Sequence, residues 1–265
     1  SATGLFAFFI VLNAGTNKAG GWNTRVGSNS GKNTKGQKNT ALGDDAGRDV
    51  TGNNNTGLGG NAGVNVVGDS NLAVGDSAGG NVEGSGNTAL GKMSGINVIG
   101  TANTATGQEA GSNVKGRNNS AFGVQSGTNV IGEGNTAMGI HSGRSITGSY
   151  NTSVGYAIGG SGKGSYNNFL GYMTGLYSKG DMNSAVGPYA GQEVVGNKNT
   201  AEGHSAGKNV KGDSNIALGD SAGENVTGNR NIALGRAAGQ GLSNVDDATS
   251  LGSGAKAAVS NSVAL

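Results

Sequence analysis

The stretch from Asn71 to Gly84 reads NLAVGDSAGGNVEG, and most of the chain consists of variations on it. The pattern returns one period later from Asn87 (NTALGKMSGINVIG) and again from Asn103 (NTATGQEAGSNVKG). An Asn occupies every sixteenth position from Asn23 to Asn231, and glycines follow at offsets of four, eight and, in all but the last copy, thirteen residues. A fixed period kept over fourteen copies is typical of a stacked solenoid.

The composition supports this interpretation and excludes several others. The 265 residues include 55 Gly, 1 Pro and no Cys, and 13% are charged. Collagen is excluded because Gly does not recur at every third residue. Disorder is disfavoured because apolar residues recur at the same positions of successive repeats; we call each such set of equivalent positions a column. The net charge of +2 gives no electrostatic reason to expect a nucleic-acid partner.

Each repeat contains two strand-like runs. The first is N-T-A-L, and the second centres on a Val eleven residues after the Asn. Glycines bracket both runs, as tight turns require, and no room is left for a helix. The sequence therefore predicts an all-β fold, a parallel β-solenoid (β-roll) whose sixteen-residue coils follow the order strand, turn, strand, turn.

We expect a single elongated domain over residues 1–265. Residues 7–22 are predicted to form a degenerate first coil and residues 23–246 the regular repeats. Residues 247–265 are predicted to form a shorter coil, because Leu251 and Leu265 are closer together than one full period. The apolar run from Leu5 to Leu12 is far shorter than the roughly 20 residues that span a bilayer. No membrane insertion is expected of this segment.

Alternation along the first strand predicts which side chains face inward. The position three after the Asn is mostly Leu, Val, Phe or Met, and with the position one after the Asn it is assigned to the interior. The Ala between them would then face outward, as a smooth contact surface for other copies of the chain. These interface candidates are Ala41, Ala73, Ala89, Ala105, Ala121, Ala137, Ala185, Ala201, Ala217 and Ala233.

A family resemblance follows from the last repeats. The stretch from Ser250 to Leu265, SLGSGAKAAVSNSVAL, resembles the head repeat of YadA-like trimeric autotransporter adhesins. The units N-T-A-L-G-x-x-A-G-x-N-V-x-G resemble a longer variant of that repeat. The family's neck, coiled-coil stalk and membrane anchor have no counterpart in this sequence.

The resemblance implies more than the repeat pattern does. It implies a left-handed β-roll, a homotrimer, type V secretion and display at a Gram-negative cell surface, anchored to the outer membrane through a region absent from this chain. It also implies non-enzymatic adhesion to a host cell-surface receptor or extracellular-matrix protein, with self-association as a further option.

The polar residues that recur at fixed positions are expected to stabilise the fold and not to form a catalytic or metal site. Stacked Asn side chains are expected to form amide ladders. The two histidines, His141 and His204, lie far apart in sequence, so neither a catalytic triad nor a zinc site is expected. Asp44, Asp76 and Asp220 share a column with Lys92 and Arg236, which indicates a solvated surface. We expect no catalytic residues, no metal and no cofactor.

Two residues break the apolar column three after the Asn. Glu202 and Thr106 stand where Leu or Val is usual. If that column faces inward, the carboxylate of Glu202 is costly to bury unless it is paired. We therefore expect a partner such as Lys198, or a coil that opens locally.

All tyrosines of the chain lie within one window. They form a candidate ligand patch, because aromatic side chains offer large contact area at low entropic cost. In the same window Gly162 and Ser178 replace the Val, and Phe169 replaces the Ala. The alternative is that the aromatic rings pack together to repair weakened coils. The six are Tyr150, Tyr156, Tyr166, Tyr172, Tyr177 and Tyr189.

Three functions remain open from the sequence. The first is a surface adhesin, and the second is a mechanical spacer without a ligand. The third is an ice-binding solenoid, which is disfavoured because its Thr column is interrupted and is assigned to the interior. That column contains Thr24, Thr40, Thr56, Thr88, Thr104, Thr136, Thr152 and Thr200.

Overall fold

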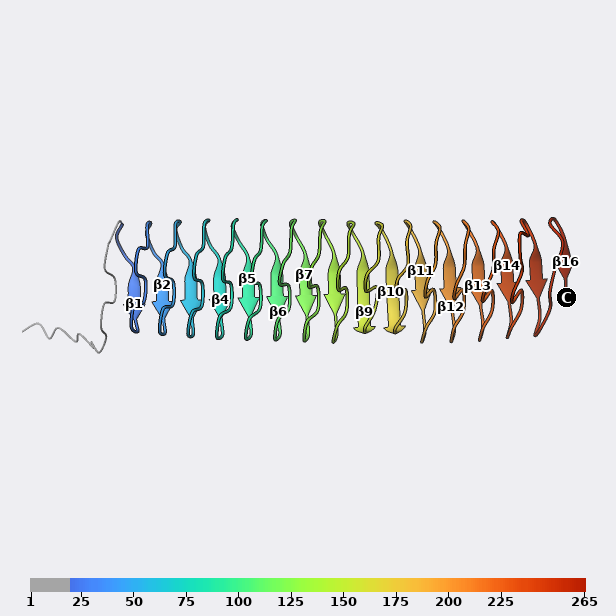
Figure 1. Cartoon of the computed structure of the whole chain (residues 1–265), viewed down its shortest axis with the longest axis horizontal. Coiled ribbons are helices and arrows are strands. Elements are labelled where there is room, and N and C mark those ends of the chain that lie inside the picture. The colour runs from blue at the N-terminus through green and yellow to red at the C-terminus, as the bar shows by residue number, and fades with distance from the viewer. Residues whose placement is uncertain (1–19) are drawn as a thin grey trace, which may run out of the picture. The chain divides into compact units, whose positions relative to one another are not determined.

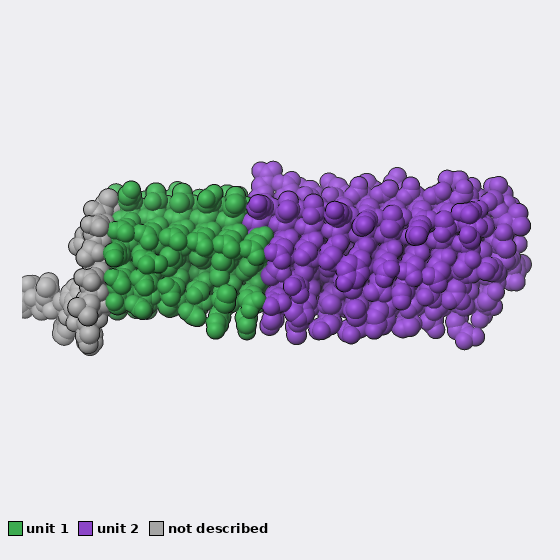
Figure 2. Space-filling model, viewed as in Figure 1, with its two compact units in different colours: residues 1–113 green, residues 114–265 purple. Residues whose placement is uncertain are grey.

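The computed structural model describes residues 20–265. These residues form short strands, isolated bridges and turns, with no helix among them. The chain divides into two compact units, residues 1–113 and residues 114–265 (Figure 2), where the sequence predicts a single domain. The predicted first coil, residues 7–22, lies outside the described part except for its last three residues.

Unit 1 is a parallel β-solenoid (Figure 1). Each strand pairs in register with the strand one sequence repeat further on, so that Thr24 lies opposite Thr40 and Ala73 opposite Ala89. The predicted period is therefore confirmed. The strands are β1 (Thr24–Val26), β2 (Thr40–Leu42), β3 (Thr56–Leu58), β4 (Leu72–Val74), β5 (Thr88–Leu90) and β6 (Thr104–Thr106).

Unit 2 continues the same architecture in its own coils. Strand pairing keeps the regular period up to Ile232, which lies opposite Ile216. A slightly longer step then leads from Ile232 to Thr249, and a shorter one from Thr249 to Val263. The last coil thus has the shorter length that the spacing of its leucines indicates. The strands are β7 (Ser120–Phe122), β8 (Thr136–Met138), β9 (Thr152–Tyr156), β10 (Asn168–Tyr172), β11 (Ser184–Val186), β12 (Thr200–Glu202), β13 (Ile216–Leu218), β14 (Ile232–Leu234), β15 (Thr249–Leu251) and β16 (Val263–Ala264).

The second predicted strand of each coil is reduced to one bridge. The residue after the Val column pairs with its counterpart in the next coil, as Thr51 does with Val67. Residues with positive φ stand on both sides of the bridge, such as Asn97 (57°) and Gly100 (147°) around Ile99. These left-handed conformations end the extended segment before a strand can form.

The Asn column forms the predicted ladder. In the coil of Asn71, the backbone N–H and the Nδ2 of Asn71 donate to Oδ1 of Asn55 at 2.9 and 3.0 Å. The same Nδ2 donates to the carbonyl oxygen of Gly84 at 2.8 Å. Asn71 is only 7% exposed, so these bonds satisfy polar groups that water does not reach.

The facing assigned to the first strand is wrong. The Ala column is 2–5% exposed and lies inside the roll, with the Val column, while larger side chains such as Leu42 (48% exposed) point outward. The interior is too narrow for the larger residues: a Cβ added to Gly47 would lie 2.8 Å from the Cβ of Ala41. The residues wrongly assigned to an outer interface are Ala41, Ala73, Ala89, Ala105, Ala121, Ala137, Ala185, Ala201, Ala217 and Ala233.

Candidate functional site

The outer face of the strands, which we call the sheet face, carries a row that is mostly Thr or Ser beside a row that is mostly aliphatic. It consists of the residues one and three after each Asn. In unit 1 Leu42 is 48% exposed, and in unit 2 Met138 and Leu170 are 47% and 49% exposed. In-register pairing places each of these side chains next to an equivalent one in the neighbouring coil, as Leu42 is next to Leu58. The sheet face thus carries a regular stripe of half-exposed apolar side chains in each unit.

Glu202 lies on the sheet face and not in the interior. It is exposed, and its register partners are Val186 and Leu218 in the neighbouring strands. The expected buried charge does not exist in the single chain, because the column that contains it faces solvent. The pairing with Lys198 that a buried carboxylate would need is therefore not required.

A row of aromatic rings lies at the C-terminal ends of strands β8 to β12, with Tyr156 and Tyr172 as the last residues of β9 and β10; we call it the ring row. Tyr156 and Tyr172 stack with centroids 5.3 Å apart, as their shared column predicts. Tyr189 meets Tyr172 edge-on at 5.5 Å, and the two histidines close the ends, His141 at 6.1 Å from Tyr156 and His204 at 5.8 Å from Tyr189. The sequence did not indicate that the histidines belong to this row. His204 lies five residues after its Asn and His141 lies six residues after its Asn, so the two occupy different positions of the repeat.

The histidines have polar neighbours as well. Nδ1 of His204 lies 3.1 Å from Oδ1 of Asp220, and Nδ1 of His141 lies 3.4 Å from a guanidinium nitrogen of Arg144. These contacts are at the surface, and neither histidine contacts a hydroxyl nucleophile in the described structure. The arrangement orients the ends of the ring row.

A second aromatic pair lies at the opposite end of the strands. Tyr150 and Tyr166 precede β9 and β10 and stack with centroids 5.2 Å apart, as predicted. On its other side the Tyr150 ring covers Gly134, where an added Cβ would lie 2.6 Å from the ring. Glycine at that position therefore makes room for the ring.

The hydroxyl of Tyr150 belongs to a charged network. It donates to Oε1 of Glu133 at 3.0 Å, and Nε of Arg117 donates to the other carboxylate oxygen. The hydrogen bond from Arg117, followed by that from Tyr150, lowers the pKa of the Glu133 carboxyl. The hydrogen bond to Glu133 raises the pKa of Tyr150. The carboxylate is thus held in its charged form.

The six tyrosines therefore do not form one patch. Tyr150 and Tyr156 lie at opposite ends of β9, six residues apart, which corresponds to about 20 Å of extended chain. Tyr177 lies on a third turn and is 54% exposed. The sequence places the tyrosines in one window, and the coil distributes them over separate edges.

The core of this window compensates for one large ring. Phe169 is 6% exposed and lies inside the roll, not at an interface as the sequence analysis assigns it. An added Cβ at Gly159 would lie 3.2 Å from its ring, and Ser153 stands in the adjacent Ala position. At Gly175 an added Cβ would overlap the same ring, so the two glycines leave the space that the ring fills.

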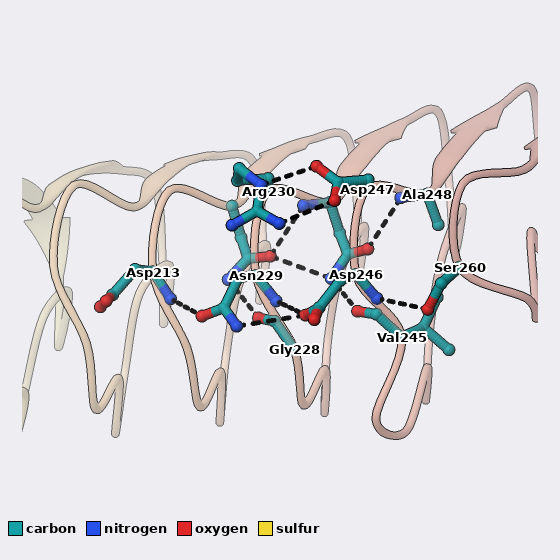
Figure 3. A network of polar contacts seen from close by, with 11 residues as sticks. Asp213, Gly228, Asn229, Arg230, Val245, Asp246, Asp247, Ala248 and Ser260 are labelled. Carbon is teal, nitrogen blue, oxygen red and sulfur yellow. Dashed lines mark hydrogen bonds and ion pairs between the residues drawn. The ribbon is translucent and has the colours of Figure 1, made fainter.

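A further ladder follows the turn that precedes each strand (Figure 3), and sequence reasoning did not identify it. Backbone N–H groups of one coil donate to side-chain oxygens of the next: Asp213 to Asn229 at 2.9 Å, Asn229 to Asp246 at 2.6 Å, and Asp246 to Ser260 at 3.0 Å. The signal in the sequence is a position, fourteen residues after the Asn, that is most often Asn, Asp or Ser, although Arg117 and Glu133 also occupy it. The ladder shows that carboxylates on this edge accept hydrogen bonds from backbone N–H groups of the preceding coil.

Next to this ladder lies an ion pair. Nε and Nη2 of Arg230 each donate to a carboxylate oxygen of Asp247 at 2.7 Å (Figure 3). This hydrogen bonding lowers the pKa of the Asp247 carboxyl and raises that of Arg230. The pair joins two successive coils of unit 2 at the surface.

Comparison of the chain with protein-family models and with curated proteins finds no match. Among residues 20–265, no group of three or more His, Cys, Asp or Glu side chains is placed to hold a metal ion. The described chain also contains no helix of the length and hydropathy needed to cross a membrane. The candidate surfaces are therefore the sheet face, the ring row and the edge that carries Tyr150 and Tyr166.

Proposed function

We propose that this chain is a head segment of a trimeric autotransporter adhesin, a non-enzymatic surface protein of a Gram-negative bacterium. In this proposal three left-handed rolls pack together and present their outer edges to a host receptor or matrix protein. The repeat resemblance from Ser250 to Leu265 supports it. The observation that carries it is the half-exposed aliphatic row of the sheet face.

The sheet face favours assembly for an energetic reason. Full burial of an aliphatic side chain contributes about 1.5–3 kcal/mol, so a half-exposed one can still gain about 1 kcal/mol. Soluble monomers rarely leave such a contiguous apolar stripe in water. Because every copy carries the same stripe, a closed symmetric oligomer can cover it in all copies. The family resemblance makes three the expected number.

Exposed tyrosines support adhesion over a role as a passive spacer. Tyr156 and Tyr166 are 46% and 53% exposed, at the two ends of the strands. Tyrosine is enriched where proteins bind partners. In a trimer each edge is repeated three times, so that weak single contacts gain from multivalency.

The test has two measurements. Sedimentation equilibrium of the whole chain is expected to give a trimer, and surface-immobilised chain is expected to retain matrix proteins or host cells. A stable folded monomer contradicts the assembly. A trimer that binds none of a panel of matrix proteins, glycans and cells supports the spacer instead.

Ice binding is a second candidate function, because one of the two reasons for discounting it, the inward facing of the Thr column, no longer holds, although the column is still interrupted. The Thr column lies on the sheet face, where Thr40, Thr56 and Thr88 are partly exposed. In unit 1 the sheet face carries no charged residue, since its outward positions are Thr, Leu and Val. Thermal hysteresis by a monomeric chain would support this function. A trimer that covers the sheet face excludes it.

A further inference from the structure

Four lysines follow the edge of unit 2 that carries Tyr150 and Tyr166; we call this set the lysine corner. All four are exposed, and within the described residues none forms an ion pair. They lie in the turns before strands β10 to β13 and are Lys163, Lys179, Lys198 and Lys211.

The carboxylates beside the lysines are hydrogen-bonded to backbone groups and, in the described chain, form no direct ion pair with the lysines. Oδ1 of Asp181 accepts the backbone N–H of Ser165 at 2.8 Å, and Oδ1 of Asp213 accepts that of Asn197 at 2.7 Å. These acids are engaged in the turn ladder and form no ion pair with a lysine of the described chain.

Two of the lysines oppose each other directly. Lys163 and Lys179 are bridge partners in successive coils. Like charges placed opposite each other on paired segments destabilise a sheet. An anion that contacts both ammonium groups removes this repulsion, so the pair is suited to a negatively charged ligand.

The adjacent tyrosines restrict what kind of anion fits. The stacked rings of Tyr150 and Tyr166 cover one face of each other, and Gly134 lies against the other face of Tyr150. Stacking of a nucleobase or of a neutral sugar on Tyr150 is therefore hindered, and its hydroxyl already donates to Glu133, so the exposed Tyr166 supplies the available hydroxyl group. Hydroxyl donors and lysine ammonium groups suit sulfate or carboxylate oxygens.

We infer that the lysine corner, with Tyr166, binds a linear acidic polysaccharide. This inference rests on the proposed adhesive function and names its ligand class. Coils of a parallel sheet repeat at about 4.8 Å, so Lys163 and Lys211, three coils apart, are separated by about 14 Å along the stack. A polymer with an anionic group on successive sugars can contact several of these lysines at once.

The test measures binding of the whole chain to dextran sulfate, which carries only sulfate, and to polygalacturonate, which carries only carboxylate. Neutral dextran is the blank. The test variant combines Lys163→Gln, Lys179→Gln and Lys211→Gln. The matched control removes the same charge elsewhere, with Lys92→Gln, Lys208→Gln and Lys256→Gln.

We expect at least one of the two acidic polymers to bind. In the test variant, the slope of log affinity against log salt concentration should fall by about two to three, one ion contact for each lysine lost. The control variant should keep the original slope. Tyr166→Phe should weaken binding by about two- to tenfold without changing the slope, because it removes one hydrogen bond and no charge.

Three results overturn the inference: no binding to either polymer, an equal loss of slope in the control variant, or equally tight binding of double-stranded DNA or polyglutamate. These failures differ from a failure of the proposed function. If the chain ignores both polymers and still adheres to cells, only the ligand class is wrong. If it adheres to nothing, the adhesive function is wrong as well.

Discussion

At the scale of the residue, the recurring Asn and the recurring glycines determine the shape of each coil. The Asn side chain joins three segments, since it bonds to the Asn before it, the Asn after it and the carbonyl of the glycine thirteen residues on, as Asn167 does with Asn151, Asn183 and Gly180. The glycines allow backbones of successive coils to approach where φ is positive. These two columns therefore tolerate little change.

The Asn column can be tested with two neighbouring residues. Asn167→Ala should lower the free energy of unfolding by about 1–3 kcal/mol, because buried backbone groups lose their partners. Asn168→Ala is the matched control, since Asn168 is exposed and its side chain lies on the sheet face. Urea unfolding of both variants gives the comparison. Equal stability would show that the buried amide ladder contributes nothing specific.

A glycine pair in unit 1 tests the close approach of coils. At Gly84 φ is 138° and an added Cβ would overlap the carbonyl oxygen of Gly100, whereas at Gly86 φ is 69° and the nearest atom would be 3.9 Å away. We expect Gly84→Ala to destabilise unit 1 strongly and Gly86→Ala to cost about 1 kcal/mol, that of a left-handed alanine. Thermal unfolding measures the difference. Similar melting temperatures would contradict the packing of the coils.

The network around Glu133 predicts a pH dependence. Its pKa is lowered below the usual 4.5, chiefly by the hydrogen bond from Arg117. Because the folded-state pKa is depressed, any stabilisation is present above pH 4.5 and is lost as the pH falls through the folded-state pKa. An NMR titration should show the Glu133 midpoint moving up in Arg117→Gln. A midpoint that does not move would exclude the ion pair as the cause.

At the scale of the element, the sequence predicted the period, the strand and the pairing but not the facing. Alternation correctly separates Ala41 from its neighbours Thr40 and Leu42, and it does not determine which side is inside. We expected the larger side chains inside, as in an ordinary core. The roll is so narrow that Ala and Gly fill it. A volume argument from the glycine column could have given the right answer.

The arrangement of the tyrosines and lysines could likewise be predicted only in part from the sequence. Column positions correctly predicted that Tyr150 stacks on Tyr166 and Tyr156 on Tyr172. The grouping into one patch was not predictable from proximity in sequence, because a coil returns to each edge only once in every sequence repeat. The lysine corner was missed because Lys163, Lys179 and Lys211 share their column with Ile131, Thr147 and Val195, and Lys198 lies in a different column.

The facing is tested by adding bulk on each side of the roll. Ala217→Leu places three more carbons in an interior where Ala217 is 3% exposed, so overpacking should cost about 1–3 kcal/mol or more. Thr147→Leu, at an exposed bridge position, should be nearly neutral. Denaturant unfolding compares them. If both variants are equally stable, the Ala column does not lie inside.

At the scale of the whole molecule, the proposed assembly and the proposed ligand binding would use different surfaces. The sheet face provides apolar area that a symmetric oligomer can cover, while the ring row and the lysine corner lie at the two ends of the strands. An oligomer formed through the sheet face would leave the lysine corner available, whereas Tyr156 and Tyr172 of the ring row end β9 and β10 and adjoin the covered face. Glu202 is the residue at which these requirements conflict, because it places a carboxylate in the middle of the apolar stripe.

Two substitutions on the sheet face should therefore change trimer stability in opposite directions. Glu202→Leu removes a charge that assembly would desolvate, and Leu218→Glu adds one at its register neighbour. Burying an unpaired charge has an unfavourable desolvation free energy, and a trimer would bury three such charges. Sedimentation equilibrium should show tighter association for Glu202→Leu and dissociation towards folded monomers for Leu218→Glu. Glu193→Leu, on the turn of another edge, is the control for the loss of charge alone. If Glu202→Leu and Glu193→Leu have the same effect, the sheet face is not the interface, and the measurement of thermal hysteresis becomes the decisive one.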